Sequence, residues 1–154
     1  MNSQEEPDNS DFSVAGSSSP RVKVSSIFLG DSVPVERLSP ASLAYIGDAV
    51  YELYIRTYYL LPPKRLSTYH QQVVNQVRAE SQAKQLRSLV PYLTELELEI
   101  VRRGRNATGK IPHRLSPEIY QQATALEALI GYLYLRDPQR LNELLAELLI
   151  NFLE

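Results

Sequence analysis

The chain has 154 residues, a formal net charge of −2 and no cysteine. This length suits one domain with a substantial hydrophobic core, and the lack of cysteine excludes disulfide bonds and thiolate metal sites. Because no stretch of about 18 or more apolar residues is free of charge, the sequence indicates no membrane span, and we expect a cytoplasmic protein.

Residues 1–36 have the composition of a disordered, low-complexity tail. They are rich in Ser, Pro, Asn and acidic residues, and they lack the apolar core of a signal peptide. The excess of acidic residues lies largely in this segment. We therefore expect a folded domain at residues 37–154 that is close to neutral, so the overall charge does not argue against a polyanionic partner.

From Ser39 onward the apolar residues recur with helical spacing, and no alternation is long enough to predict a strand. Ser39 can cap a first helix that has Pro40 at its first position and continues to Leu61, where the next two prolines end it. The expected buried face of this helix consists of Leu43, Ile46, Val50, Leu53 and Tyr54.

Residues 67–90 predict a second helical region, which is either one bent helix or two. Thr94 and Glu97 form a capping-box pair at the start of a further helix that extends to Arg105. The acidic residues of this helix lie early and its cations lie late, as the helix dipole favours.

Residues 106–115 contain Gly and Pro and predict a loop. Ser116 with Pro117 starts the most apolar helix of the chain, and the segment behind Asp137 and Pro138 forms a last amphipathic one. We therefore expect an all-α fold of roughly six helices.

Two carboxylates stand in apolar surroundings that do not suit a charge. Asp48 lies in YIGDAV and Glu127 in ATALEALIGYLYL, where a charge costs several kcal/mol unless it is paired or binds a cation. Small residues that would let two helices approach closely accompany them: Gly47, Ala49, Ala128 and Gly131. If the two helices cross there, Asp48 and Glu127 can share a divalent cation such as Mg²⁺ through oxygen ligands.

Helical spacing alone leaves a simpler role open for both carboxylates. An isolated Asp or Glu on a mostly apolar helix is usually at its solvated edge or pairs with an arginine. Nothing in the spacing requires Asp48 and Glu127, which are far apart in the sequence, to meet in space.

Residues 102–114 contain several positively charged residues and no acidic one. They lie at the expected end of a helix and in the loop after it. Such a cluster neutralises phosphates well, which favours contact with a nucleic acid. The alternative is a set of cations that complement the helix dipole, which suits Arg102 and Arg103 but not a run that continues through the loop.

These features together resemble a known family. AYIGDAVYE is similar to the signature helix of the ribonuclease III catalytic domain, which carries a metal-binding aspartate, and ALEALIGYLYL is similar to the second signature, which carries a metal-binding glutamate. YIGDAVYE, VRAESQA, RRGRNA and ATALEALIGYLYL resemble more closely the short Mini-ribonuclease III branch, which lacks the double-stranded-RNA-binding domain. The resemblance covers roughly residues 38–149.

The resemblance implies that Asp48 and Glu127 are the catalytic pair and hold Mg²⁺, with Mn²⁺ as a substitute. Larger family members carry further acids at three positions that are Ala41, Ala44 and Thr124 here, so part of their ligand set is missing. The basic segment matches the family segment that enters the RNA groove. Its candidate RNA-binding residues are Arg102, Arg103, Arg105, Asn106, Lys110, His113 and Arg114.

The implied function is a Mg²⁺-dependent endoribonuclease that hydrolyses phosphodiester bonds in double-stranded RNA. The resemblance further implies a two-fold homodimer and a precursor ribosomal (23S) RNA as substrate. The absence of acids at Ala41, Ala44 and Thr124 motivates an alternative, a non-catalytic helical module that binds RNA or a protein partner.

Overall fold

The structure is a computed structural model that describes residues 33–107 and 109–152. Within these residues it contains helices and turns and no strand, which confirms the all-α expectation. The six α-helices are α1 (Pro40–Tyr59), α2 (Leu66–Val77), α3 (Ala79–Leu89), α4 (Glu95–Asn106), α5 (Pro117–Arg136) and α6 (Pro138–Phe152). Two short 3₁₀ helices, η2 (Val35–Arg37) and η3 (Val90–Tyr92), precede α1 and follow α3.

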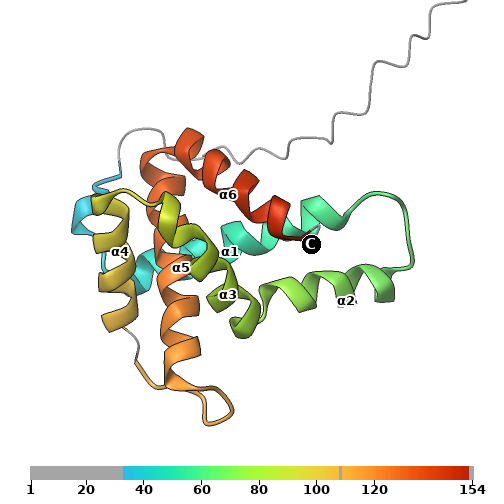
Figure 1. The fold of residues 1–154 in the computed structure, drawn as a ribbon, viewed down its shortest axis with the longest axis horizontal. Coiled ribbons are helices and arrows are strands. Elements are labelled where there is room, and N and C mark those ends of the chain that lie inside the picture. Colours follow the sequence, from blue (N-terminus) through green and yellow to red (C-terminus); the bar gives the residue numbers. More distant parts are fainter. Residues whose placement is uncertain (1–32, 108, 153–154) are drawn as a thin grey trace, which may run out of the picture.

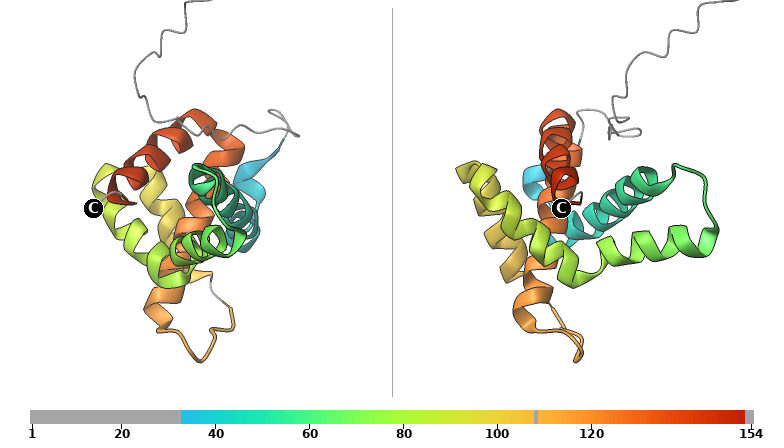
Figure 2. Two further views of the ribbon diagram at one scale, coloured as in Figure 1. Left: turned by 90° about the vertical axis from the view of Figure 1, so that its right-hand side faces the viewer. Right: turned by 45° about the vertical axis from the view of Figure 1, so that its right-hand side comes forward.

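Helix α5 lies at the centre of the fold (Figure 1). It packs most extensively against α1, α4 and α3, and α6 packs against both α5 and α3. The end of α1 and the whole of α2 extend away from this group as an antiparallel arm (Figure 2). The buried side chains in the middle of α5 therefore have neighbours from several helices, which is the arrangement that an internal polar site requires.

The starts of α1 and α4 have the side-chain caps that the sequence predicts. Ser39 caps α1, since its Oγ accepts a hydrogen bond from the Ser42 backbone N–H at 3.1 Å. Thr94 and Glu97 form the expected capping box, with the Glu97 N–H donating to Thr94 Oγ1 at 3.2 Å and the Thr94 N–H donating to Glu97 Oε2 at 2.9 Å. Ser116 occupies the cap position of α5 but makes no side-chain capping bond there.

The second helical region consists of two helices that meet at Arg78. This residue has φ −66° and ψ 155°, an extended conformation that ends α2 and starts α3. The Ser81 hydroxyl donates to the Asn75 carbonyl across this junction and satisfies one of the carbonyls that the end of α2 leaves open. Of the two arrangements that the spacing left open, the chain adopts the two-helix one.

The buried face of α1 differs in one position from the expected one. Leu43, Val50 and Tyr54 are buried, but Leu53 is 62% exposed. Tyr51 is fully buried instead, because the helix turns Tyr51 rather than Leu53 toward the core. The prediction of Leu53 as a core residue was therefore wrong.

The described chain begins slightly before the expected domain boundary at residue 37. Val35 lies in η2, is 2% exposed and belongs to the hydrophobic core. The rest of the segment interpreted as a tail, residues 1–32, lies outside the described residues. In the part that is described, no helix has both the length and the apolar character needed to cross a membrane.

Candidate active site

The crossing of α1 and α5 is close because each helix has a glycine at the contact. A Cβ on Gly47 would overlap the backbone carbonyl of Glu127 and lie 2.8 Å from the backbone nitrogen of Gly131. A Cβ on Gly131 would in turn overlap the backbone carbonyl of Leu43. The two helices therefore touch through their backbones, and this contact sets the position of Asp48 relative to Glu127.

Two of the four small residues predicted to permit this approach do so, and two do not. Gly47 and Gly131 form the contact, whereas Ala49 is exposed. Ala128 is buried but faces α4, where its Cβ would lie 2.9 Å from a Cβ on Gly104. The small residues of α5 thus serve two crossings, one with α1 and one with α4.

The structure brings Asp48 and Glu127 together. Their carboxyl groups are hydrogen-bonded to one another, with Asp48 near solvent and Glu127 partly buried. Burial and the negative charge of Asp48 raise the pKa of Glu127 to about 7. Burial, followed by the negative charge of Glu52, also raises the pKa of Asp48, while the hydrogen bond from Glu127 lowers it. Below about pH 7, Glu127 therefore holds a proton that it can donate to Asp48.

Gln82 of α3 is a third member of this cluster, and the sequence analysis did not identify it. Its side chain is 2% exposed and hydrogen-bonds to Glu127, which lowers the pKa of that carboxyl. A buried amide that donates to a carboxylate stabilises the ionised form. No signal in the sequence marks Gln82, because a neutral amide on the largely polar segment VRAESQA does not conflict with its surroundings.

The pair suits a divalent cation better than it suits a salt bridge. No lysine or arginine is among the groups that set the two pKa values, so no cation of the chain offsets the charge of the two carboxylates when both are ionised. Mg²⁺ is commonly held by one or two carboxylates, with water and substrate phosphate completing its coordination. Among the described residues no group of three or more Asp, Glu, His or Cys side chains is placed to hold a metal ion. The two paired carboxylates fit a cation of this kind by their chemistry, since oxygen ligands are the ones that Mg²⁺ prefers.

The positions that carry further acids in larger family members do not supply them here. Ala41 is exposed, Ala44 is buried in the core, and Thr124 is partly buried on α5. None of the three offers a carboxylate to the pair.

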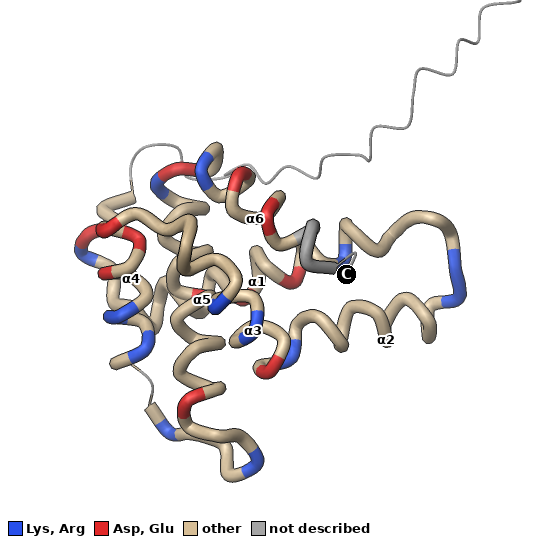
Figure 3. The backbone as a smooth tube through the Cα atoms, in the orientation of Figure 1, with Lys and Arg blue, Asp and Glu red and all other residues tan. Residues whose placement is uncertain are grey.

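The basic segment runs from the last turn of α4 into the loop before α5. Figure 3 shows its lysine and arginine positions along the lower end of α4 and in the loop below it. The seven candidate residues are all exposed: Arg102, Arg103, Arg105, Asn106, Lys110, His113 and Arg114. Arg102 is engaged locally, since its Nε donates to Glu99 Oε2 at 2.8 Å.

The helical part of the basic segment packs against α5. Gly104, between Arg103 and Arg105, contacts α5 where a Cβ would lie 3.0 Å from the Cα of Ala125. This point is within one helical turn of Glu127 along α5.

Comparison with known proteins agrees with this arrangement. The family described as Ribonuclease III domain matches residues 41–138. A Mini-ribonuclease 3 from Synechocystis sp. is 57% identical over 122 residues, covering 79% of this chain and 85% of the relative. A Mini-ribonuclease 3 from Gloeobacter violaceus is 52% identical over 115 residues, covering 75% of this chain and 85% of that relative.

A solved structure is similar as well. A crystal structure of a protein from Fusobacterium nucleatum aligns with a TM-score of 0.70 and 31% identity, covering 77% of this chain and 98% of that chain. The family match, over residues 41–138, includes the segments that carry Asp48, Gln82 and Glu127. The chain therefore belongs to the ribonuclease III domain family and is an endoribonuclease of that family.

Proposed function

We propose that the chain hydrolyses phosphodiester bonds in double-stranded RNA and depends on a divalent cation, Mg²⁺ or in its place Mn²⁺. The observation that carries this proposal is the pairing of Asp48 and Glu127, in which burial and then the charge of Asp48 raise the pKa of Glu127 to about 7. A divalent cation relieves the repulsion between the two carboxylates without a proton.

The residues of this chain have distinct tasks in the proposed reaction. When bound, Mg²⁺ lowers the pKa of a coordinated water and offsets charge on the phosphate. Asp48 and Glu127 would hold the ion, one carboxylate from each helix. Gln82 donates to Glu127 and favours the ionised form of its carboxyl. The glycine contact between α1 and α5 brings the backbone positions of Asp48 and Glu127 close together.

The basic segment is the proposed contact for the RNA backbone. Duplex RNA is recognised mainly by its A-form shape, phosphates and 2′-hydroxyls. The exposure of Lys110 and Arg114 in the loop, and the position of the α4 end beside α5, support this role. Lys110→Gln and Arg114→Gln should each lower the slope of log affinity against log salt by about 0.9. A slope equal to that of the wild type would remove these residues from the interface.

A homodimer is proposed from an apolar stripe on α1. Tyr45 is 86% exposed and Leu53 is 62% exposed, and Ala49 lies between them at the spacing of one helix face. Exposed apolar stripes of this kind mark interaction surfaces, and a second copy of the chain can cover the stripe symmetrically. Leu53→Lys should convert a dimer into a monomer in analytical ultracentrifugation. A wild-type chain that sediments as a monomer would contradict the proposal.

The natural substrate is proposed to be a precursor of ribosomal (23S) RNA, and the cytoplasm is proposed as the site of action. The resemblance to the Mini-ribonuclease III branch supports the substrate. The lack of cysteine and the proposed action on duplex RNA support the proposal of the cytoplasm.

One assay tests the proposed activity directly. The purified full chain is incubated with a structured duplex RNA in Mg²⁺, in Mn²⁺ and in EDTA. We expect defined cleavage products in either metal and none in EDTA. Duplex binding without products in both metals would favour the non-catalytic alternative, and cleavage that persists in EDTA would exclude a metal requirement.

A further inference from the structure

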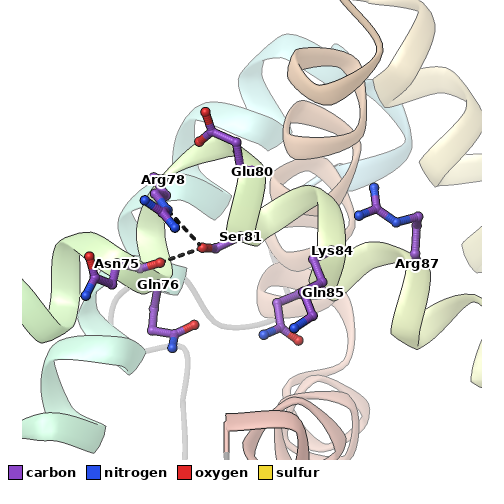
Figure 4. Close-up of a pocket in the computed structure, with 8 residues that line it drawn as sticks. All are labelled: Asn75, Gln76, Arg78, Glu80, Ser81, Lys84, Gln85 and Arg87. Atoms are coloured by element: carbon purple, nitrogen blue, oxygen red, sulfur yellow. Dashed lines mark hydrogen bonds between the residues drawn. The ribbon is translucent and has the colours of Figure 1, made fainter. Parts of the chain in front are cut away.

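A polar groove lies between the end of α2 and α3, apart from the basic segment already described. Its volume is about 500 Å³ (Figure 4). Arg78, Lys84 and Arg87 line it together with one acid, Glu80. Within the described residues, none of the three cations forms an ion pair, so the groove carries an excess of positive charge.

The cations differ in how far they are engaged by the protein itself. Arg87 donates to the Gln122 side chain of α5 at 2.7 Å. Arg78 makes a long contact of 3.4 Å from its Nε to the Ser81 hydroxyl. Lys84 is exposed. Arg78 and Lys84 therefore have N–H groups that are available to bind an anion.

Gln85 adds an unpaired hydrogen-bond acceptor to the lining of the groove. The residue is 4% exposed and lines the groove, and its Oε1 is buried without a hydrogen-bond partner among the described residues. Figure 4 shows its amide directed from α3 toward the side of the groove where Gln76 of α2 lies. A buried acceptor without a partner is costly, so the site favours a ligand that brings a hydrogen-bond donor.

The position of the groove links it to the carboxylate site. Gln82, which hydrogen-bonds to Glu127, lies on the same helix as Gln85 and one turn before it. Helix α3 therefore has the groove and the carboxylate pair within one turn of each other. A ligand that occupies both must be extended and must carry repeated negative charges.

We propose that the α2–α3 groove binds the sugar–phosphate backbone of RNA next to the cleavage site. Arg78 and Lys84 contact phosphates, and Gln85 Oε1 accepts a hydrogen bond from a ribose 2′-hydroxyl. The inference rests on the proposed function, because it takes duplex RNA as the substrate. RNA is favoured over a second protein chain because the lining is polar and cationic, whereas the exposed apolar stripe of α1 includes none of the lining residues.

The charge part of the proposal is tested by binding. Affinity for a short RNA duplex is measured by fluorescence anisotropy in EDTA, over a series of salt concentrations, with the full chain. Arg78→Gln and Lys84→Gln should each weaken binding about fivefold near physiological salt and lower the salt slope by about 0.9. Arg136→Gln is the matched control, since Arg136 pairs with Glu36 at the other end of α5, and it should bind as the wild type does.

The 2′-hydroxyl part is tested with a second substrate. A 2′-fluoro duplex keeps the A-form but lacks the hydroxyl donor. Gln85→Leu should weaken binding to the RNA duplex about threefold to tenfold and leave binding to the 2′-fluoro duplex unchanged. An equal loss on both duplexes would assign Gln85 to the fold rather than to RNA, and circular dichroism and thermal unfolding identify a misfolded variant.

The outcomes separate this inference from the proposed function. If the wild type cleaves duplex RNA while the Arg78 and Lys84 variants bind with unchanged affinity and salt slope, the groove proposal is overturned and the function stands. If these variants lose RNA binding only because they become monomeric in ultracentrifugation, the groove is an interface between copies and the proposal is also overturned. If the wild type binds no duplex RNA, both proposals fail.

Discussion

Gly47 of α1 lies directly against the backbone carbonyl of Glu127 on α5, with no room for a side chain between them. This contact places Asp48, the next residue of α1, beside the Glu127 carboxyl. Backbone packing therefore sets how closely the two helix positions that carry Asp48 and Glu127 approach each other.

Gly47→Ala should destabilise the fold and separate the two carboxylates. The added Cβ meets backbone atoms, which cannot move away as a side chain can, so we expect a loss of about 3 kcal/mol in the free energy of unfolding. Gly109→Ala is the control, because a Cβ there meets nothing within 4 Å, and it should change stability by less than about 0.5 kcal/mol. Equal stability of the two variants in urea denaturation would contradict the close crossing.

The stability of the metal-free protein should fall as pH rises through the range in which Glu127 loses its proton. The pKa of Glu127 is about 7 in the folded chain against an ordinary value of 4.5, so the folded state binds more protons between these values. Stability is fully present below about pH 4.5 and declines by about 2 kcal/mol as pH rises past 7, partial exposure weakening the full effect. Glu127→Gln should remove this decline. Urea denaturation in EDTA across this range measures it, and a parallel pH profile for both proteins would speak against the assignment.

Gln82→Leu should move the pH-dependent loss of stability at Glu127 to higher pH. The Gln82 side chain favours the ionised form of Glu127, so its removal raises the pKa of Glu127 further above 7. The pH at which Mg²⁺ begins to raise the melting temperature should rise with it, because the cation needs the ionised carboxylate. Gln85→Leu, at another buried glutamine of α3, should leave this pH unchanged. A shift of the same size in both variants would point to a general loss of packing.

Arg140→Leu should destabilise the fold without altering the carboxylate site. Arg140 Nε donates to Glu97 Oε1 at 2.7 Å, and Glu97 is 4% exposed. Burial acts to raise the pKa of Glu97, but the hydrogen bonds from Arg140 and Thr94 outweigh it, so the pKa is lowered. Removing Arg140 leaves a buried charge uncompensated, at a cost of about 3 kcal/mol.

The contribution of the Arg140–Glu97 pair has a definite pH dependence. It is present above the ordinary glutamate pKa of 4.5 and is lost as pH falls through the lowered pKa of Glu97. The stability difference between wild type and Arg140→Leu should therefore shrink in acid. Arg136→Leu breaks an exposed pair with Glu36 and should cost less than about 1 kcal/mol. Equal losses of stability for the two arginine variants would show that the partly buried pair with Glu97 contributes no more than the exposed pair with Glu36.

The sequence predicted the parts of the fold that depend on local signals. Ser39, Thr94 and Glu97 form the caps that their positions indicated, because a cap requires only the residues next to it. The break between α2 and α3 could not be assigned, since Arg78 is neither glycine nor proline and the break depends on how α3 packs against α5. Leu53 was misassigned for a related reason: spacing identifies an apolar face but not whether the chain itself covers it.

The site was predictable where a residue conflicted with its surroundings. Asp48 and Glu127 were recognisable as carboxylates in apolar helices, and Gly47 and Gly131 as residues that permit contact. Gln82 gave no such conflict, because a neutral amide is unremarkable on a helix that is otherwise polar. Its role depends on the three-dimensional approach of α3 to α5.

The most direct measurement for the central claim is cleavage of duplex RNA by Asp48→Asn and Glu127→Gln in Mg²⁺. Each change removes a charge from the proposed cation site while keeping the shape of the side chain. We expect each variant to lose cleavage by on the order of a hundredfold or more while its RNA affinity in EDTA and its sedimentation stay as in the wild type. Cleavage by either variant at close to the wild-type rate would contradict the assignment of Asp48 and Glu127 as the catalytic pair.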